Sequence, residues 1–272
     1  MKTTKVKLGS LEMQLLSYAQ MRKMDILRLG ELAPVLGITL KQERELFSRL
    51  SRTGMIIRLT KGIYLAPPQI PAGGRWTVSS YYLLARLMEV LEGRYQISGP
   101  SAFQFYGFDN QVPNRIFVYN DQLFGEKEVG GTQFVFIKTA AQRLDAAKGM
   151  KTPEGVEACM VTESRALVDA VYDWSRYNTL PRAYRWIAAA LEKKSVLADR
   201  LIADTIKYGN KGTIKRIGYL LAQLGIPEDR LQKMKLLLGP NRSLIPWIPN
   251  EPAKGSINRE WGLIINGAIP QT

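Results

Sequence analysis

The segment spanning residues 24–67 constrains the fold of this chain most, because it combines helical patterns, a turn and two strand-like runs in a fixed order. Apolar residues recur at helical spacing through residues 29–36, and Gly37 then permits the backbone reversal of a tight turn. Thr39 is followed three residues later by Gln42, which is the spacing of a capping box at a helix start. Gly54 is the expected end of that second helix.

The second helix is expected to have one apolar and one polar, basic face. The apolar face consists of Leu40, Leu46, Phe47 and Leu50. The opposite face carries Lys41, Gln42, Glu45, Ser48, Arg49 and Arg52. Residues 55–59 and 63–66 are apolar enough to form strands, and Thr60-Lys61-Gly62 joins them as a hairpin tip. This order predicts a winged helix-turn-helix, a class whose second helix enters the major groove of DNA.

The pattern gives a set of candidate DNA contacts. They are Lys41, Gln42, Arg44, Glu45, Ser48, Arg49, Arg52, Arg58, Thr60 and Lys61. Gln42 matches adenine and Arg49 matches guanine in hydrogen-bonding pattern, although the capping box competes for Gln42. Arg44 and Arg58 suit phosphate, and Lys61 at the tip suits phosphate or the minor groove. The alternative is a helix-hairpin module that binds only protein; the basic helix face and basic tip favour DNA.

Positive charge is concentrated in two parts of the chain. The whole chain has 38 Lys and Arg against 24 Asp and Glu, a net charge of +14, and residues 1–66 hold 12 against 5, a net +7. Residues 190–240 hold 10 against 5, a net +5. Such fields attract polyanions. The later cations form a candidate partner surface: Lys193, Lys194, Arg200, Lys207, Lys211, Lys215, Arg216, Lys233 and Lys235. They suit DNA backbone, an acidic protein, or simple solvation, and the sequence leaves these three open.

The length of 272 residues favours two domains. Pro67, Pro68, Pro71 and two glycines form a connection, so we expect a DNA-binding domain over 1–70, a linker over 71–77 and a second domain over 78–272. In that domain we expect a helix at 78–92, a small sheet within 94–161 and helices within 163–238, followed by a strand-like tail that folds back. The four later helices are expected at 180–191, 196–207, 214–224 and 229–238. The predicted fold class is α+β and mainly helical.

Catalysis is not expected. The chain has no histidine and one cysteine, Cys159, which excludes Ser-His-Asp, Cys-His and thiolate-zinc sites. Asp109, Asp121, Glu126 and Glu128 are acidic, but the last two lie in a Gly-flanked turn and match no metal-site spacing. No catalytic residue, metal or cofactor is therefore predicted.

Residues 209–213, Gly-Asn-Lys-Gly-Thr, resemble a phosphate loop only faintly. They lack the Gly-x4-Gly-Lys spacing and a preceding strand, and fit a break between two helices better. No run of about 18 apolar residues and no signal-peptide core occurs, so no membrane association is expected. A single cysteine suits a reducing cytoplasm.

Several segments in order resemble one family, the AbiEi-type antitoxins of AbiE abortive-infection systems, which are type IV toxin-antitoxin systems. The segments are RLTKGIYLAP (58–67), ISGPSAFQFYGF (97–108), TESRALVDAVYDW (162–174), KRIGYLLAQLG (215–225) and WGLIIN (261–266). The resemblance implies an N-terminal DNA-binding domain, a C-terminal antitoxin domain and a toxin partner similar to a nucleotidyltransferase. One departure is Tyr106, where related sequences often carry a histidine before the glycine; its loss fits a non-catalytic domain.

The helix-wing pattern predicts a DNA-binding regulator, and the resemblance implies that it is a cytoplasmic antitoxin of phage defence. It would counteract its toxin and repress its own operon by binding operator DNA, expected to contain repeats. The alternative is a stand-alone winged-helix regulator whose second domain senses a ligand or forms dimers, and a toxin reading frame beside the gene distinguishes the two. A third class, a nucleic-acid-processing enzyme, is tested by metal dependence on DNA and RNA.

Overall fold

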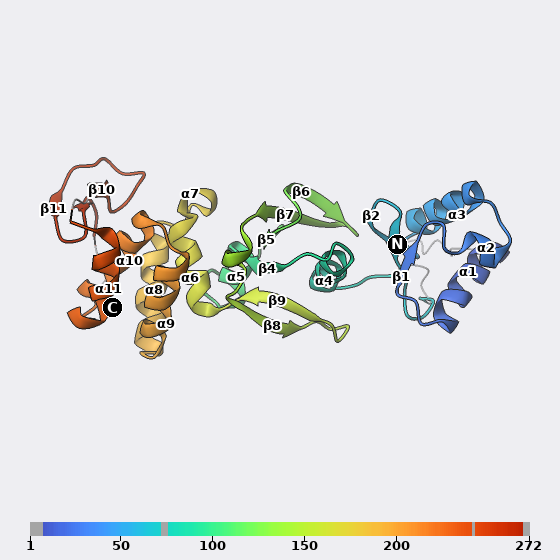
Figure 1. The fold of residues 1–272 in the computed structure, drawn as a ribbon, viewed down its shortest axis with the longest axis horizontal. Helices are drawn as coiled ribbons and strands as arrows, with labels where there is room; N and C mark the ends of the chain where they lie inside the picture. Colours follow the sequence, from blue (N-terminus) through green and yellow to red (C-terminus); the bar gives the residue numbers. More distant parts are fainter. Residues whose placement is uncertain (1–7, 72–75, 241–242, 269–272) are drawn as a thin grey trace. The chain divides into compact units, whose positions relative to one another are not determined.

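The computed structural model describes residues 8–71, 76–240 and 243–268 (Figure 1). Its class is mixed α+β, with helices and several small sheets. The chain folds into two compact units. The N-unit comprises Met1–Arg94, Gly125–Phe134 and Gly149–Ala158, and the C-unit comprises Tyr95–Phe124, Val135–Lys148 and Cys159–Thr272.

The N-unit begins with a small helical module closed by a three-stranded sheet (Figure 1). Its elements are α1 (Ser10–Met21), β1 (Ile26–Arg28), α2 (Ala33–Leu36), α3 (Leu40–Thr53), β2 (Ile57–Thr60) and β3 (Ile63–Leu65). The strand order is β1-β3-β2, and both pairings are antiparallel. Leu15, Leu27, Phe47 and Leu50 are among the buried residues of one core that joins these elements.

Two elements of this module differ from the sequence prediction. α1 was not anticipated, and residues 26–28 form a strand beside the run that has helical spacing. Ile26 pairs with Leu65 and Leu27 is fully buried, so the apolar residues just before that run belong to a sheet. Only α2, a single turn, remains helical before Gly37, whose φ of 62° makes the predicted reversal.

The prediction for α3 is largely confirmed. Thr39 and Gln42 form the capping box, and Gly54 ends the helix with φ of 77°. Leu46, Phe47 and Leu50 are buried, but Leu40 is 54% exposed, so its placement on the apolar face was wrong. The position one turn further along that face is taken by Glu43, which is fully buried.

The N-unit also contains α4 (Ser80–Val90) and the turn-side parts of two hairpins. Ser79 caps α4 by accepting from the Tyr82 amide, and its own amide and hydroxyl donate to the Glu154 carboxylate at 2.6 Å each. α4 therefore belongs to the same compact unit as the first module. The domain boundaries predicted from the sequence, at residues 70 and 78, stay a prediction.

A six-stranded sheet follows in the order β6-β7-β5-β4-β9-β8. The strands are β4 (Tyr95–Ser98), β5 (Ile116–Asn120), β6 (Gly125–Val129), β7 (Thr132–Lys138), β8 (Ala147–Lys151) and β9 (Glu157–Val161). β4 pairs antiparallel with β5 and parallel with β9. The turn predicted to hold Glu126 and Glu128 is instead β6, and the Gly130-Gly131 reversal joins β6 to β7. β6 is an edge strand, where exposed charged side chains are tolerated.

The C-unit is completed by helices and a folded-back tail. The helices are α5 (Pro100–Phe105), α6 (Glu163–Tyr172), α7 (Trp174–Tyr177), α8 (Arg182–Lys193), α9 (Leu197–Tyr208), α10 (Lys211–Gln223) and α11 (Glu228–Leu238). The four predicted later helices are thus confirmed within a few residues. The break at 209–213 is confirmed too, because Asn210 caps α10 through the Thr213 amide at 2.8 Å.

The tail forms a second three-stranded sheet, β10 (Ile245–Pro246), β12 (Leu263–Ile265) and β11 (Ser256–Asn258), in that spatial order. Trp247 and Trp261 are fully buried, as the predicted fold-back requires. The Trp247 ring stacks on Tyr184 with centroids 3.8 Å apart, and Trp261 fills a notch at Gly218 where a Cβ would lie 2.1 Å away. Across the described residues, no helix has the length and apolar character needed to span a bilayer.

Candidate nucleic-acid interface

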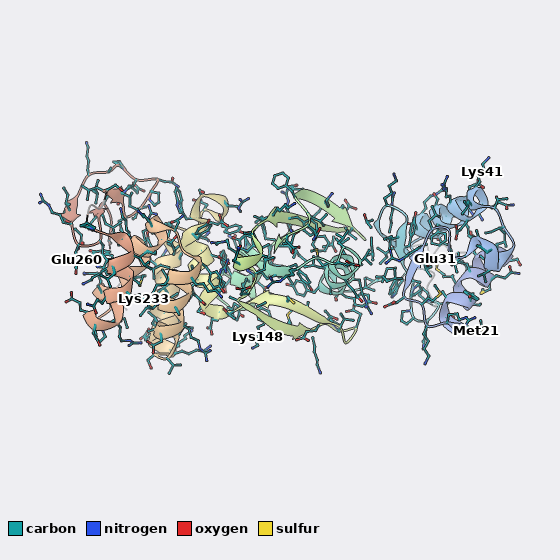
Figure 2. All side chains as sticks on the ribbon, viewed as in Figure 1. Met21, Glu31, Lys41, Lys148, Lys233 and Glu260 are labelled. Carbon is teal, nitrogen blue, oxygen red and sulfur yellow. The ribbon has the colours of Figure 1, made fainter. Side chains whose placement is uncertain are left out.

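The sequence-predicted contacts lie together on α3 and on the β2–β3 hairpin. Nine of the ten are exposed, and Thr60 is partly buried. Figure 2 shows Lys41 extending from α3 into solvent. The opposite side of α3 carries the buried Leu46, Phe47 and Leu50, so the core fixes which face of the helix remains available.

Gln42 is occupied by the capping box. Its side-chain oxygen accepts from the Thr39 amide at 2.8 Å and from the Thr39 hydroxyl at 3.0 Å. A bidentate contact with adenine needs both the oxygen and the nitrogen of the amide. Of the two roles that the sequence left open for Gln42, the described geometry therefore fills the capping role.

Arg49 is held across the module by α1. Its Nε lies 3.1 Å from the Glu12 carboxylate, whose second oxygen accepts from the Gly9 amide at 2.8 Å. The Arg49 side chain is nonetheless 50% exposed. An exposed pair of this kind stabilises by about 0–1 kcal/mol, so Arg49 is oriented by Glu12 without being removed from solvent.

The hairpin tip is tied to the rest of the module. Gly62 adopts φ of 74°, and its carbonyl accepts from the Leu29 amide at 2.8 Å. The Arg58 Nε donates to the Thr60 carbonyl at 3.3 Å, beside a register shift between these residues. Lys61 stands exposed at the turn. The tip therefore presents its cations from a backbone that is held at both strands.

Glu43 is a positioning residue that the sequence prediction missed. Its buried carboxylate accepts from the amides of Gly30 at 2.7 Å, Leu32 at 3.0 Å and Ala33 at 3.1 Å. These amides open the turn of α2, where backbone donors lack helical partners. Glu43 therefore fixes α2 against α3. An acidic residue three positions before Leu46 on the apolar stripe is the signal that could have found it.

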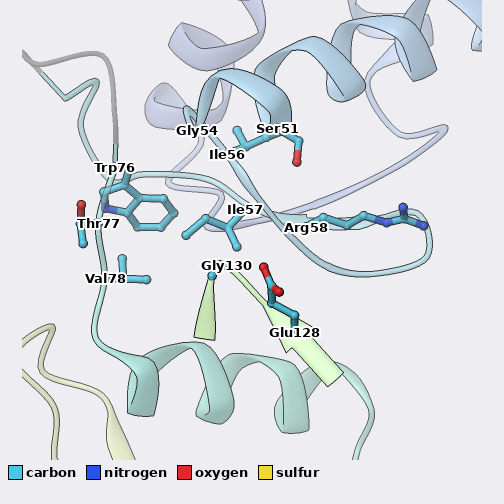
Figure 3. Close-up of a pocket in the computed structure, with 11 residues that line it drawn as sticks. Ser51, Gly54, Ile56, Ile57, Arg58, Trp76, Thr77, Val78, Glu128 and Gly130 are labelled. Carbon is cyan, nitrogen blue, oxygen red and sulfur yellow. The ribbon is translucent and has the colours of Figure 1, made fainter. Parts of the chain in front are cut away.

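A cavity of about 570 Å³ lies beside the hairpin within the N-unit (Figure 3). It is lined by Ser51, Gly54, Ile56, Ile57, Arg58, Trp76, Thr77, Val78, Glu128, Gly130 and Gly131. Figure 3 shows the Trp76 indole turned toward Ile57, while Arg58 runs away from them along the hairpin. The Trp76 amide donates to the Gly54 carbonyl at 3.0 Å, which holds this wall. The cavity wall combines the apolar side chains of Trp76, Ile57 and Val78 with the charged side chains of Arg58 and Glu128.

Two members of the predicted C-unit partner surface are not on the surface. Lys215 is 3% exposed and Arg216 is 6% exposed, which corrects their assignment to an outer basic face. The Lys215 amine donates to the Ser243 carbonyl, and Arg216 donates to the carbonyls of Pro246 at 3.0 Å and Trp247 at 3.3 Å. Burial lowers the pKa of Arg216. Both cations fasten the tail to α10.

Several of the remaining C-unit cations form ion pairs. Lys194 lies 2.8 Å from Glu163 and Lys207 lies 3.1 Å from Asp145. Lys235 pairs with Glu228 at 2.6 Å and also with Glu260. Within the described ranges, the exposed cations of the set that make no ion pair are Lys193, Arg200, Lys211 and Lys233 (Figure 2 labels Lys233).

The acidic residues considered as metal ligands are not brought together. Asp109 pairs with Arg182 at 3.1 Å in the C-unit, whereas Glu128 accepts from Gln133 at 2.7 Å in the N-unit. Among the residues that the structure describes, no three His, Cys, Asp or Glu side chains gather as a metal site requires.

A buried polar network in the C-unit was not predicted. Asp169 on α6 is fully buried and accepts from Arg165 at 2.7 Å and from Ser98 on β4 at 3.0 Å. Burial raises the pKa of Asp169, and the Arg165 guanidinium opposes that shift. Arg165 also lies 3.9 Å from the ring centroid of Tyr208. The network joins α6 to the sheet and to α9, a structural role; the i, i+4 spacing of Arg165 and Asp169 is the signal for it.

Comparison with known proteins gives a likeness of fold alone. No protein-family model matches the chain, and no curated protein is similar to it in sequence. Among solved structures, the crystal structure of the RV2827C protein from Mycobacterium tuberculosis is similar, with a TM-score of 0.57 and 15% sequence identity. The likeness covers 94% of this chain and 92% of that chain. Nearly the whole order of elements is therefore shared with a solved protein, and the shared fold carries no activity with it.

Proposed function

We propose that this chain is a DNA-binding antitoxin that represses its own operon in the cytoplasm. In this proposal α2, α3 and the β2–β3 hairpin act as a winged helix-turn-helix, with α3 in the major groove and the hairpin as the wing. The observation that carries the proposal is the exposed basic face of α3 beside the exposed Lys61 of the hairpin, both set on one buried core.

The balance of exposed charge supports a polyanion at this surface. The exposed cations of α3 are Lys41, Arg44, Arg49 and Arg52, against one exposed acid, Glu45. The other acid of α3, Glu43, is buried and satisfied by backbone amides. The hairpin adds Arg58 and Lys61. Neutralising phosphates with such groups releases counterions, so binding would weaken steeply with salt.

The roles proposed for single residues follow their partners. Arg49 keeps its two terminal nitrogens for guanine while Nε is held by Glu12. Gln42 acts first as a cap and contributes its amide nitrogen only. Arg44, Arg58 and Lys61 contact phosphate, and the operator is expected to contain repeats.

The antitoxin activity is assigned to the C-unit on the strength of the resemblance to AbiEi-type antitoxins. The proposed target is a nucleotidyltransferase-like toxin encoded beside the gene, in an abortive-infection system of phage defence. Lys193, Arg200, Lys211 and Lys233, with the ion-paired Lys194, Lys207 and Lys235, are the exposed or partly exposed cations that could cover an acidic toxin surface. Lys215 and Arg216 are left out of that surface because they are buried.

A gel-shift titration of the full chain tests the DNA half of the proposal. Its own upstream region should be retarded at lower protein concentration than a scrambled duplex of equal length, and the affinity should fall steeply between 50 and 200 mM salt, by an amount on the order of 10³-fold for about six phosphate contacts. Equal affinity for both duplexes would contradict the proposed operator recognition. Absence of any shift at low salt would contradict the proposed DNA binding.

Co-expression tests the antitoxin half. The product of the adjacent gene should arrest growth when expressed alone, and the full chain should restore it. A variant with Arg44, Arg49 and Lys61 all changed to Ala should still restore growth from a separate promoter if neutralisation is independent of DNA. Failure of the soluble full chain to restore growth would overturn the assignment.

The second candidate function, a ligand-sensing regulator without a toxin, is favoured by the cavity beside the hairpin. A molecule bound against Trp76 and Ile57 would lie next to Arg58, a proposed phosphate contact. In that case operator affinity should change when a small molecule stabilises the protein, and the adjacent gene product should be harmless.

A further inference from the structure

We infer that the C-unit binds a nucleotide in a cavity formed by the α5–β5 loop, the start of α6 and one side of α8. The cavity has a volume of about 300 Å³, and its walls consist of Tyr106, Gly107, Phe108, Glu163, Trp186, Ala189, Ala190, Lys193 and Lys194. Its walls combine an aromatic end with a charged end, and they share no residue with the proposed DNA interface.

Three aromatic rings gather at one end of the cavity, where the Arg182 guanidinium also lies over the Trp186 ring, 5.6 Å from its centroid. The rings of Phe108 and Trp186 are inclined by only 18°, with centroids 6.3 Å apart, and Tyr106 lies 5.9 Å from Phe108 at 31°. The rings are fixed from behind: the Tyr106 hydroxyl donates to the Val161 carbonyl at 2.7 Å, and Phe103 contacts Trp186 at 5.2 Å. Aromatic side chains of this kind are stacking platforms for nucleobases, because every base presents a π-face.

The spacing on α8 places a positive charge at the right distance from that platform. Trp186, Ala189, Ala190 and Lys193 follow each other at i, i+3, i+4 and i+7, so they form one stripe along the helix. The two alanines leave room beside Trp186. Lys193 lies seven residues from Trp186, about 10 Å along the axis. That span corresponds to the separation of a base from the phosphates of the same nucleotide.

Lys193 and Lys194 differ in what they can offer a phosphate. Lys194 is committed to Glu163, with its amine 2.8 and 3.1 Å from the two carboxylate oxygens. Lys193 is exposed and makes no ion pair with any described residue. Lys193 is therefore the residue that would bind the phosphate.

Glu163 supplies a carboxylate to the site. Its side chain is 24% exposed at the start of α6, and it lines the cavity together with the rings and Lys193. A carboxylate only accepts hydrogen bonds, which suits ribose hydroxyls and not phosphate. Base, sugar and phosphate are thus matched by the rings, by Glu163 and by Lys193 in turn.

Calorimetric titration of the full chain tests the site with AMP, ADP and ATP, using adenosine and ribose 5-phosphate as the two halves. The nucleotides should bind at least 10-fold more tightly than either half. Trp186→Leu should weaken ATP binding by about 5- to 100-fold through loss of stacking. Lys193→Ala should weaken ATP binding and leave adenosine binding unchanged. Lys148→Ala, an equal loss of charge on β8 of the same unit, should change neither.

Ala189→Trp provides a second variant in case Trp186→Leu does not fold, because residue 189 is exposed and a large ring there fills the cavity. It should abolish nucleotide binding. A short single-stranded oligonucleotide that displaces ATP, and does so less well in Lys193→Ala, would identify the source of the nucleotide as a strand; its failure to displace ATP would identify the free nucleotide. Absence of binding by every nucleotide at 5 mM would overturn the inference, as would binding insensitive to both Lys193→Ala and Ala189→Trp.

Discussion

Glu43→Gln should destabilise the N-unit although it replaces a single oxygen. In the wild type one carboxylate oxygen accepts from Leu32 and Ala33 and the other accepts from Gly30. A glutamine keeps one accepting oxygen, so two of these bonds can survive. Its NH2 group then faces the Gly30 amide, and two donors meet in a fully buried site.

The magnitude follows from these three bonds. One buried donor left without an acceptor costs about 1–3 kcal/mol, and the loss of charge weakens the two remaining bonds, which gives a total of about 2–4 kcal/mol. For a protein of this size that corresponds to a fall in melting temperature of roughly 5–15 °C. α2 would also lose its fixed position against α3, so the proposed DNA binding should weaken together with stability.

Thermal unfolding followed by circular dichroism measures the effect, with Glu45→Gln as the matched control. Glu45 lies on the same helix two residues away and is exposed, so the identical chemical change should shift the melting temperature by less than about 2 °C. Equal melting temperatures for Glu43→Gln and Glu45→Gln would refute the reasoning, because they would show that the buried carboxylate does not fix α2.

Three further predictions concern the DNA surface, the tail and the rings of the C-unit. Arg49→Ala should reduce the preference for the proposed operator over random DNA by about 1–3 kcal/mol in competition gel shifts. Lys61→Ala should instead weaken binding to all DNA sequences alike and reduce the slope of affinity against salt by about 1. The same effects from the surface control Lys148→Ala would contradict both predictions. Gly218→Ala should destabilise the C-unit in chemical denaturation, since its new methyl group would meet the buried Trp261 ring, and an unchanged midpoint would show that this notch is not filled. Burial raises the pKa of Tyr106 to about 12 from 10.0, so its contribution to stability is complete below pH 10 and is lost as the pH rises toward 12. Between pH 10 and 12 the Tyr106→Phe variant should therefore lose less stability than the wild type. Parallel curves of stability against pH for the two proteins would contradict this.

The sequence predicted best those elements whose determinants are local. The capping box of Thr39 and Gln42, the turn at Gly37 and the end of α3 at Gly54 each depend on residues a few positions apart, and all three are confirmed. The exposed face of α3 follows from the same periodicity. The placement of Leu40 on the buried face was wrong, because periodicity assigns a residue to a face without showing how far the core extends along that face.

Two of the strands that were missed, β6 and β8, share a physical cause. β6 and β8 are the two edges of the six-stranded sheet, and they are largely exposed and charged: GEKEV and AKGMK. An edge strand needs only one partner and little apolar surface, so its sequence resembles that of a turn. The β1 strand was missed because it has only three residues and lies directly before the run with helical spacing.

For the candidate surfaces, too, the sequence predicted features with local causes and missed those that depend on distant residues. Charge predicted which residues of α3 and the hairpin are exposed, but it also placed Lys215 and Arg216 on an outer face. Their acceptors are carbonyls about thirty positions later in the chain, at Ser243, Pro246 and Trp247. No local sequence pattern predicts a hydrogen-bond partner so far along the chain. The ring cluster of the inferred nucleotide cavity likewise joins residues 106–108 to residue 186, which only the folded chain brings together.

The tail is hydrogen-bonded to α10 and its two indoles are buried, so removing it differs from removing an exposed chain end. Deleting residues 243–268 would take away the Ser243, Pro246 and Trp247 carbonyls to which Lys215 and Arg216 donate, together with the two indoles that fill the space beside α10. The face of α10 that carries Gly218 would then lose its apolar cover, and the Tyr184 ring would lose the stacked Trp247. A stop codon late in the gene should therefore behave as a core mutation.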